Sequence, residues 1–421
     1  MSKSEKPFIL IPLDLPNIRV LETEITAEGN FIITVETTIN GTRCCKCGNF
    51  TAEFHGLDAW IQIRHLPILD CKLYLRLRPK RYRCPDCEGR PTTTQKLEWR
   101  EDSSPHTTAF DDYLLKSLIN STVEDVSRKA DIGYDSVEGA IDRRVAKQVK
   151  WNEYESLDTV GIDEISRRKG QRDFIVIVTA RLANGEVKVV GVLPDKKKQT
   201  IKHFLHSIPV RLKKTIKSVC TDLYDGFINA SKEEIPAARR VADRFHVAKA
   251  YGEGVDKLRK KETRRLKREL STKEYEKIKG AMWAFRRRRA ELSEEEQELL
   301  ERMFSYSPEL KRAYELREEL TGIFDQEITK EEARQEIGLW QARVRESGVK
   351  GFEKFIVTLN NWMEEITNYF VARESSGFLE GVNNKIKVLK RRCYGIFNLS
   401  RLYQRLFLDF EGYDRFSKST V

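Results

Sequence analysis

The chain has 421 residues, which is too long for one ordinary domain. Because 40% of the residues are hydrophobic, the chain can bury at least one substantial core. Its 76 lysines and arginines outnumber its 65 aspartates and glutamates, and the net charge of +11 favours a polyanionic partner over an acidic small molecule. No apolar run approaches the roughly 20 residues of a membrane-spanning helix, and the first residues do not resemble a secretory signal, so we expect a cytoplasmic protein without membrane contact.

Residues 1–100 are predicted to form a β-rich module that binds zinc. Alternating apolar residues at 31–35 and 73–77 indicate strands. Most of the cysteines lie between positions 44 and 87, and in a reducing cytosol such a cluster favours metal ligation over disulfides. Two CxxC pairs offer four thiolates to a tetrahedral, structural zinc ion: Cys44, Cys47, Cys84 and Cys87. Cys45 and Cys71 are spare, and either could replace a member of this set.

Residues 101–152 are predicted to form a helix-turn-helix domain that binds DNA. Apolar residues recur at spacings of three and four between 107 and 149, as expected of helices. Thr122 offers a cap to one helix, residues 131–133 form the turn, and Asp135 offers a cap to a second helix that begins near Ser136. The outward face of the second helix supplies the predicted DNA contacts: Arg143, Arg144 and Lys147. Many helical hairpins that do not bind DNA share this pattern.

From residue 153 the pattern changes to that of a mixed sheet flanked by helices. Buried strands are predicted at 160–165, 174–179, 187–193, 216–220 and 240–242, and helices at 200–208 and 224–230. This order matches a ribonuclease-H-like core, whose first part we place at residues 153–248. Residues 249–350 are strongly charged and poor in β-branched residues, which predicts an α-helical insertion. Residues 351–421 then form the last part of the core and a C-terminal tail, so the fold class is multidomain α+β.

Two of the predicted strands end in an aspartate, Asp163 in GIDE and Asp222 in CTDLYDGF. Carboxylates at adjacent strand ends can converge on a pair of cations. A third acid, Glu380, lies on a predicted helix whose buried stripe is Leu379, Val382, Ile386, Leu389 and Cys393. The opposite helix face combines Glu380 with amides and cations: Asn383, Asn384, Lys387, Lys390 and Arg391. Four other acids are weaker candidates, because they lie in flanking or loop-like positions: Glu164, Asp173, Asp195 and Asp225.

The segments GIDE, CTDLYDGF, ADRFHV and LEGVNNKIKVLKRRCYGIFN resemble the motifs of the ISL-three family of bacterial insertion-sequence transposases. The resemblance extends through most of the chain. It implies that Asp163, Asp222 and Glu380 are the catalytic Asp-Asp-Glu triad, which binds two Mg²⁺ ions with Mn²⁺ as an alternative. Asp243 and His246 in ADRFHV are similar to an auxiliary element of such transposases, although the residues alone indicate a hydrogen-bonded pair at the core edge equally well.

The resemblance also implies a function. We expect a protein that binds the terminal inverted repeats of an insertion sequence, cleaves the ends by two-metal hydrolysis and transfers the 3′-OH ends to target DNA. Its partner is double-stranded DNA, it is nucleoid-associated when bound, and it acts as a homodimer or larger assembly. Further DNA contacts are expected from one face of the Glu380 helix: Asn384, Lys387, Lys390 and Arg391.

Other hypotheses stay open at this point. Trp283 and Phe285 lie beside four arginines at 286–289 and are expected to contact DNA near the cut by stacking and cation pairing. The competing function is that of a non-catalytic DNA-binding regulator derived from a transposase. A third hypothesis is a metal-dependent nuclease that cleaves without joining.

Overall fold

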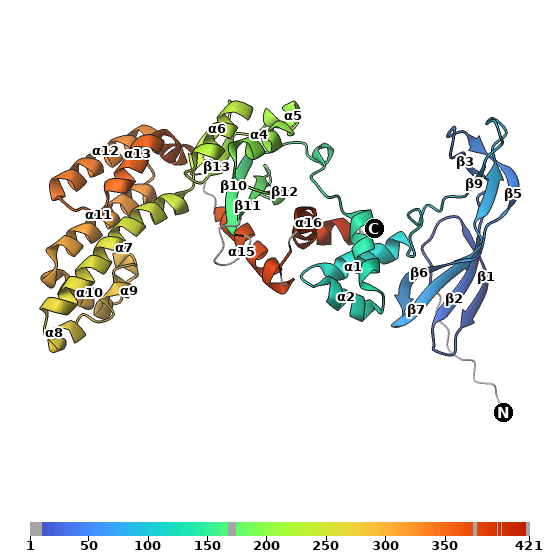
Figure 1. Cartoon of the computed structure of the whole chain (residues 1–421), viewed down its shortest axis with the longest axis horizontal. Coiled ribbons are helices and arrows are strands. Elements are labelled where there is room, and N and C mark those ends of the chain that lie inside the picture. The colour runs from blue at the N-terminus through green and yellow to red at the C-terminus, as the bar shows by residue number, and fades with distance from the viewer. Residues whose placement is uncertain (1–10, 167–173, 374–376, 394, 397, 418–421) are drawn as a thin grey trace. The chain divides into compact units, whose positions relative to one another are not determined.

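The computed structural model describes residues 11–166, 174–373, 377–393, 395–396 and 398–417 (Figure 1). The chain divides into two compact units: Met1–Lys147 with Gln404–Val421, and Gln148–Tyr403. The five-part domain division expected from the sequence stays a prediction.

Small sheets form the N-terminal part of the first unit. Its strands are β1 (Ile18–Ile25), β2 (Phe31–Thr37), β3 (Thr42–Arg43), β4 (Phe50–Thr51), β5 (Glu53–Leu57), β6 (Ile61–Ile68), β7 (Cys71–Leu77), β8 (Lys80–Arg83) and β9 (Thr92–Thr94). They form sheets in the orders β1-β2-β7-β6 and β5-β8-β9 and a β3-β4 hairpin, and only the β2–β7 pair runs parallel among these described strands. Leu73, Leu75 and Leu77 alternate along β7 and are buried, so the strands predicted at 31–35 and 73–77 are present as β2 and β7.

Three helices follow in the same unit: α1 (Thr108–Leu118), α2 (Val123–Ala130) and α3 (Tyr134–Arg144). The Thr122 side chain accepts a hydrogen bond from the backbone N–H of Asp125, as predicted for the α2 cap. The predicted start of the next helix is wrong, because α3 begins at Tyr134 after Gly133, which has an extended backbone and no side chain that could cap the helix. Asp135 therefore lies inside the first turn of α3.

From Gln404 onward, the C-terminal helix α16 (Leu399–Phe416) belongs to the first unit. Its buried Leu408 packs with α1, α2 and α3. Arg405 is buried as well, and its guanidinium donates hydrogen bonds to the carbonyl oxygens of Leu118 and Ser121, at 3.2 and 2.6 Å. Asp409 accepts a hydrogen bond from the backbone N–H of Asn120. The chain end thus stabilises helices that lie almost 300 residues earlier in the sequence.

The second unit contains a five-stranded mixed sheet of order β12-β11-β10-β13-β14. Its strands are β10 (Thr159–Ser166), β11 (Phe174–Arg181), β12 (Val187–Leu193), β13 (Ser218–Thr221) and β14 (Arg239–Ala242). The helices between them are α4 (Lys198–His206), α5 (Val210–Lys213) and α6 (Asp225–Glu234), and α4 and α6 lie beside the sheet in Figure 1. β10 runs antiparallel to β11 and parallel to β13, and β13 runs parallel to β14. β10 is buried along most of its length, so the buried strand predicted at 160–165 is present.

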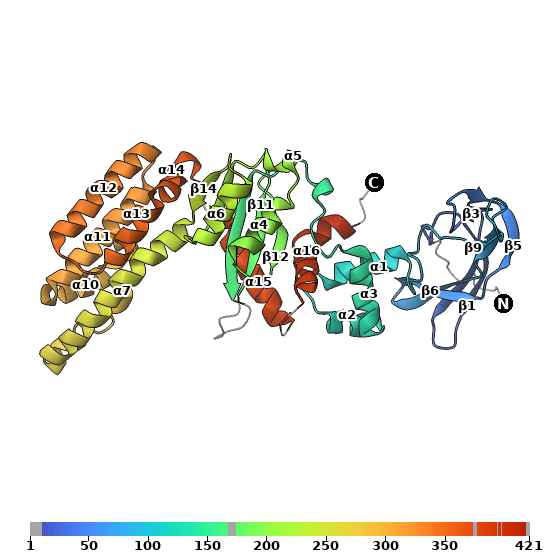
Figure 2. The same ribbon diagram turned by 45° about the horizontal axis from the view of Figure 1, so that its top comes forward.

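Helices make up the rest of the second unit. They are α7 (Arg244–Glu269), α8 (Thr272–Glu276), α9 (Ala281–Ala284), α10 (Glu294–Tyr306), α11 (Pro308–Asp325), α12 (Lys330–Ser347), α13 (Glu353–Thr367), α14 (Tyr369–Ala372) and α15 (Gly377–Arg392), with short 3₁₀ helices at Trp151–Glu153 and Arg289–Glu291. Figure 2 shows α7 alongside α11 and α13. Trp340 of α12 is fully buried among these helices, and its indole N–H donates a hydrogen bond to the Leu316 carbonyl oxygen at 2.8 Å. Within the part of the chain that the structure describes, no helix is both long and apolar enough to cross a bilayer.

Candidate functional site

Three aspartates lie in one row across three neighbouring parallel strands: Asp222 and Asp243 directly follow β13 and β14, whereas Asp163 lies inside β10, one residue beyond its last pair with β13. In the register, residues of β10, β13 and β14 stand side by side: Ile162, Thr221 and Ala242. The next residues along these strands are Asp163, Asp222 and Asp243. Carboxyl ends of neighbouring parallel strands share one edge of a sheet, so the three carboxyl groups start from the same row. The predicted strand end at Asp163 is wrong, because β10 continues to Ser166, whereas β13 does end just before Asp222; the fold nevertheless brings the two side chains together, as expected.

His246 links two of these aspartates. It lies in the first turn of α7, directly after β14, and its Nδ1 is 2.8 Å from Asp222 Oδ1 and 2.9 Å from Asp243 Oδ2, so that one N–H is shared between the two carboxylates. Asp243 is also the N-cap of α7, because its Oδ1 accepts a hydrogen bond from the backbone N–H of Phe245 at 2.8 Å. The hydrogen-bonded Asp243–His246 pair expected from the sequence is present. The contact between His246 and Asp222 was not predicted, because only the folded sheet brings the start of α7 to the end of β13.

The cluster carries more negative than positive charge. Asp163 is only 7% exposed, and burial together with the negative charge of Asp222 raises the pKa of Asp163 to about 6. Burial alone would lower the pKa of His246, but hydrogen bonds and charge from Asp222 and Asp243 outweigh burial and raise that pKa to about 10. One imidazolium therefore faces three carboxyl groups, and a bound cation would relieve the remaining repulsion.

Helix α15 lies at the end of β10 and contacts Asp163 directly. The side-chain N–H of Asn383 donates a hydrogen bond to Asp163 Oδ2, and the Nζ of Lys390 donates one to the Ser166 carbonyl oxygen at 2.5 Å. Val382, Ile386 and Leu389 are buried, as predicted for the apolar stripe, whereas Cys393 is only partly buried and the Leu379 side chain lies outside the described residues. The polar face expected from the sequence thus reaches the aspartate row through Asn383.

Glu380 belongs to the first turn of α15, and its side chain lies outside the described residues. Its backbone position is three residues before Asn383, and residues three apart share one face of a helix. The other predicted DNA contacts of this helix differ in exposure: Asn384, Lys387 and Arg391 are exposed, and Lys390 is half-buried. The participation of Glu380 in the cluster stays a prediction.

The donor set of the cluster fits a divalent cation. Carboxylate oxygens of Asp163 and Asp222 lie within 4.8 Å of each other and of a His246 ring nitrogen. The two carboxylates are the candidate ligands, because the protonated His246 ring holds Asp222 and Asp243 and has no free lone pair for a metal. Asn383 Oδ1 is buried beside them and has no hydrogen-bond partner among the residues that the structure describes. A buried oxygen without a donor is costly unless a cation or water satisfies it. Carboxylate and amide oxygens are the ligands that Mg²⁺ prefers, so the residues present suit that ion.

Two of the four weaker acidic candidates, Glu164 and Asp195, make structural contacts. The Glu164 carboxylate pairs with the Lys196 ammonium at 2.8 Å. Asp195 accepts hydrogen bonds from Lys197 N–H at 3.0 Å and from the Thr200 hydroxyl at 2.7 Å, and so stabilises the start of α4. Asp225 is exposed in the first turn of α6, and Asp173 lies outside the described residues. No metal-ligand group within the described residues includes these acids.

The four predicted zinc ligands lie together in the first unit. Sγ atoms of Cys44 and Cys87 are 3.9 Å apart and those of Cys47 and Cys84 are 3.7 Å apart. Tetrahedral zinc with Zn–S bonds of about 2.3 Å requires Sγ separations of about 3.8 Å, so the four thiols fit the ion. Backbone N–H groups of Cys47 and Lys46 lower the pKa of Cys44 to about 6, which favours its thiolate. Cys45 and Cys71 stand outside this group, which closes the alternatives left open by the sequence.

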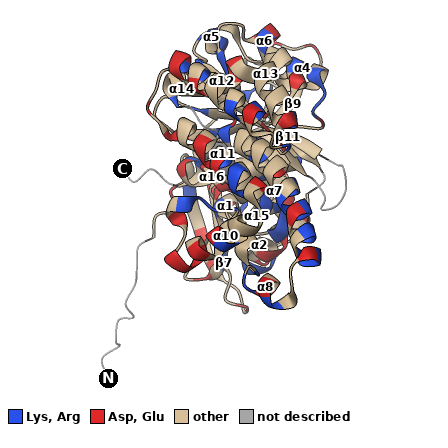
Figure 3. Ribbon diagram, turned by 90° about the vertical axis from the view of Figure 1, so that its left-hand side faces the viewer, with Lys and Arg blue, Asp and Glu red and all other residues tan. Residues whose placement is uncertain are grey.

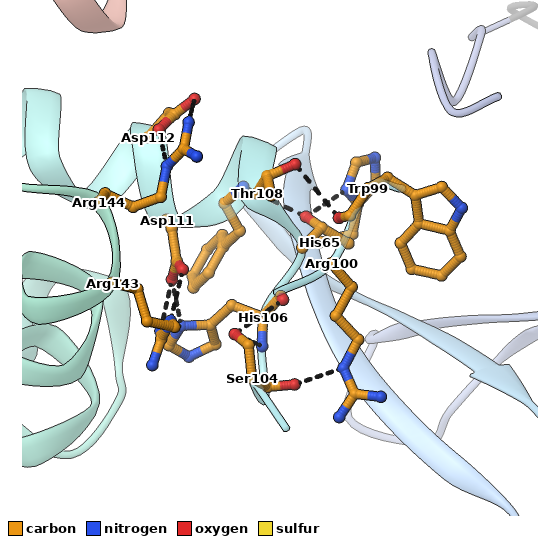
Figure 4. Close-up of polar contacts among 12 residues, drawn as sticks. His65, Trp99, Arg100, Ser104, His106, Thr108, Asp111, Asp112, Arg143 and Arg144 are labelled. Atoms are coloured by element: carbon orange, nitrogen blue, oxygen red, sulfur yellow. Dashed lines mark hydrogen bonds and ion pairs between the residues drawn. The ribbon is translucent and has the colours of Figure 1, made fainter. Parts of the chain in front are cut away.

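The expected outward direction of Arg143 and Arg144 in α3 is wrong. Figure 4 shows Arg143 beside Asp111 and His106, and Arg144 beside Asp112. The Arg143 guanidinium donates to both carboxylate oxygens of Asp111, at 2.8 and 2.9 Å, and the Asp111 side chain is only 1% exposed. These two arginines therefore hold α3 against α1. Lys147 is 63% exposed and lies 3.7 Å from Asp142; DNA contact by any of the three basic residues stays a prediction.

The cluster expected at 283–289 also differs from the sequence interpretation. Phe285 is 1% exposed and packs in the helical core, so it is not available for stacking on a base. Trp283 is 63% exposed, with the Arg286 guanidinium 5.6 Å from its ring centre. Each of the four arginines pairs with an acidic side chain: Arg286 with Asp256, Arg287 with Glu296, Arg288 with Asp325 and Arg289 with Glu301. Their charges are largely satisfied within the protein.

Known proteins resemble this chain along most of its length. Residues 160–406 match a transposase family model of the ISL3 group, residues 95–145 match the "Helix-turn-helix domain of transposase family ISL3", and residues 40–87 match the "zinc-finger of transposase IS204/IS1001/IS1096/IS1165". The chain is 25% identical to the "Transposase for insertion sequence element IS1001" of Bordetella parapertussis over 353 residues, which cover 84% of each chain. It is 24% identical to the IS1557 transposase of Mycobacterium tuberculosis over 377 residues, covering 84% of this chain and 82% of that protein. The zinc-finger match and the four-cysteine geometry together support a structural zinc ion.

Proposed function

The chain belongs to the ISL3 family of transposases, and from this premise we propose that Asp163, Asp222 and Glu380 carry out the cleavage and joining of DNA. The protein would cleave the ends of an insertion sequence and transfer the 3′-OH ends to target DNA. The observation that carries this proposal is the placement of Asp163 and Asp222 side by side, each one residue beyond the last pair of the parallel strands β10 and β13, with α15 in contact with Asp163. The strand order β12-β11-β10-β13-β14 supports the proposal of a ribonuclease-H-like core, with the helices at 249–350 as an insertion before α15.

The three acids would hold two Mg²⁺ ions, for which Mn²⁺ is an alternative. When bound, these ions supply the Lewis acidity that hydrolysis and strand transfer require. Asn383 keeps the Asp163 carboxylate in place through its N–H, and His246 does the same for Asp222. Lys387 and Arg391 are exposed on α15, where their cations can neutralise phosphates that flank the scissile bond. No protein nucleophile is needed, because water and the 3′-OH attack in turn.

The N-terminal modules would recognise the substrate. The helix-turn-helix would read the terminal inverted repeats, and the zinc module would support it. Two element ends must be held together during transposition, so we propose a homodimer or larger assembly on double-stranded DNA.

A Mg²⁺-dependent strand-transfer assay on duplexes that carry the terminal inverted repeats tests this function. We expect Asp163→Asn, Asp222→Asn and Glu380→Gln each to lower the cleavage rate by about 10³-fold, since several kcal/mol of transition-state stabilisation are lost. Asp225→Asn is the matched control, because it removes an exposed carboxylate only three residues from Asp222 and should leave the rate unchanged.

The competing functions predict other outcomes in the same assay. A non-catalytic regulator would bind the repeats and cleave nothing, and a nuclease would cleave without joining. Cleavage that is equally fast in the unaltered protein and in the three variants would refute the assignment of the site.

A further inference from the structure

Helix α7 carries a continuous basic face in addition to His246. Six exposed lysines and arginines repeat at intervals of three and four residues along it: Lys257, Lys260, Lys261, Arg264, Lys267 and Arg268. These six side chains, here called the α7 basic face, line a surface depression with a volume of about 650 Å³. The opposite side of the helix is buried through Val255, Leu258 and Leu266. Blue segments in Figure 3 mark the basic residues along α7.

The charges of this face are mostly not neutralised within the protein. Lys260 pairs with Asp256 at 2.9 Å, and among the described residues the structure gives no ion pair to the other five. The arginines at 286–289 are different, because each has an acidic partner. Like charges spaced three and four residues apart on a helix repel one another. A polyanion that binds this face would relieve that repulsion.

The face is also aligned with the candidate active site. At 100° per residue, all six basic positions lie within about 60° of His246 around the helix axis. Ala250 and Glu253 fill the same line between His246 and Lys257. With a rise of about 1.5 Å per residue, Lys257 lies about 16 Å and Arg268 about 33 Å along the helix from His246. One continuous helix thus joins the catalytic cluster to a row of cations that extends away from it.

We propose that the α7 basic face binds the phosphate backbone of the DNA duplex whose phosphodiester occupies the active site. B-DNA rises 3.4 Å per base pair, so the contacts would fall about 5 to 10 base pairs from the scissile phosphate. A row of six lysines and arginines suits contacts to phosphates, which position the duplex without recognising its base sequence. This inference rests on the proposed function, since it places the scissile phosphate beside Asp222 and His246.

Binding measurements with duplexes of different length test the proposal. The full-length protein is titrated with three element-end duplexes. The first stops about 4 base pairs from the cut; the second continues for about 12 base pairs on the element side of the cut, and the third for about 12 base pairs on the flanking side. The test variant is Lys261→Gln/Arg264→Gln/Lys267→Gln, which keeps helix-forming side chains. The control, Lys273→Gln/Lys311→Gln/Arg312→Gln, removes the same charge from exposed positions outside the face.

For the unaltered protein and the control, we expect one of the longer duplexes to bind more tightly than the short one. The test variant should lose this gain in affinity for the longer duplex. Each lost phosphate contact makes the slope of log affinity against log salt concentration shallower by about 0.9, so the loss of three cations should change the slope by about 2 to 3. The duplex that shows the loss identifies which side of the cut α7 binds. A second variant, Arg264→Lys, keeps the charge and should keep the gain, which separates charge from folding.

Equal affinities of the test variant and the control for all three duplexes would overturn the proposal. Mg²⁺-dependent cleavage by the unaltered protein is measured on the same duplexes. Absence of cleavage contradicts the proposed function alone. If the protein cleaves DNA but the test variant binds the longer duplexes as tightly as the control does, the α7 contact alone is contradicted.

Discussion

Arg143→Gln is predicted to destabilise the helix-turn-helix, because it removes the main partner of a buried carboxylate. Burial alone would raise the pKa of Asp111, but hydrogen bonds and charge from His106 and Arg143 outweigh burial and lower that pKa. Breaking a buried ion pair from one side costs about 3 to 5 kcal/mol. We expect about 3 kcal/mol, since the His106 ring stays hydrogen-bonded to Asp111 at 2.8 Å.

Hydrogen–deuterium exchange of the amides in α1 and α3 measures this loss locally. A loss of about 3 kcal/mol corresponds to exchange that is about 10²-fold faster. Asp111→Asn/Arg143→Gln should recover part of the loss, because no unpaired charge remains buried. The lowered pKa of Asp111 also makes the contribution of the Asp111–Arg143 pair to stability depend on pH. The contribution is fully present at pH values above the ordinary aspartate pKa of about 3.9, and it is lost as the pH falls through the lowered pKa of Asp111.

Arg128→Gln in the neighbouring helix α2 is the matched control. Arg128 pairs with Glu124 at 2.7 Å, but the two side chains are 78% and 55% exposed, so the change should cost less than about 0.5 kcal/mol. If Arg143→Gln accelerated exchange no more than Arg128→Gln, the structural role of Arg143 would be refuted.

Three further predictions concern other parts of the chain. Gly254→Ala should lower the thermal unfolding temperature, because a Cβ on Gly254 would lie 1.9 Å from the Gly351 carbonyl oxygen, and overpacking of this kind costs about 1 to 3 kcal/mol. The control Gly252→Ala has open space in the same helix and should stabilise the protein by about 1 kcal/mol. A Gly254→Ala variant that unfolds at a higher temperature would contradict the close approach of the two backbones. Cys84→Ser should abolish zinc retention, measured by elemental analysis of the purified protein, and Cys71→Ser should retain it, so equal zinc in both variants would contradict the ligand set. Chelation of zinc from the unaltered protein should increase exchange in the strands around the cysteines and leave the five-stranded sheet protected, and uniform exchange in both regions would argue against a local structural role.

The sequence predicts those features whose signal is local. Buried strands such as β10 appear in the sequence as apolar runs, and an aspartate that interrupts such a run, like Asp163, is visible without any knowledge of its neighbours. Each CxxC pair places two thiols in one turn, so the zinc ligands were found even though the pairs lie far apart. Helix start positions were less certain, as α3 shows, because Gly133 leads into a helix without a side-chain cap.

The contacts that were missed depend on partners far away in the sequence. Arg143 looks like a solvent-facing arginine in the helical pattern, and only the packing of α3 on α1 places it beside Asp111. His246 reaches Asp222 because β13 and β14 are parallel neighbours, which the strand pattern alone does not determine. Phe285 has arginines on one side in the sequence, yet the fold buries it with Phe304 and Tyr314.

The positions of α15 and α16 have a consequence for biosynthesis. A chain still on the ribosome that has not reached residue 377 has no Asn383 to orient Asp163, and it also lacks Arg405 and Asp409, which hydrogen-bond the turn between α1 and α2. Early domains usually fold first during translation, but here α1 and α2 and the aspartate cluster both depend on contacts from helices that are synthesised later. The packing of α1 and α2 and the orientation of Asp163 are therefore completed only after α15 and α16 have been synthesised.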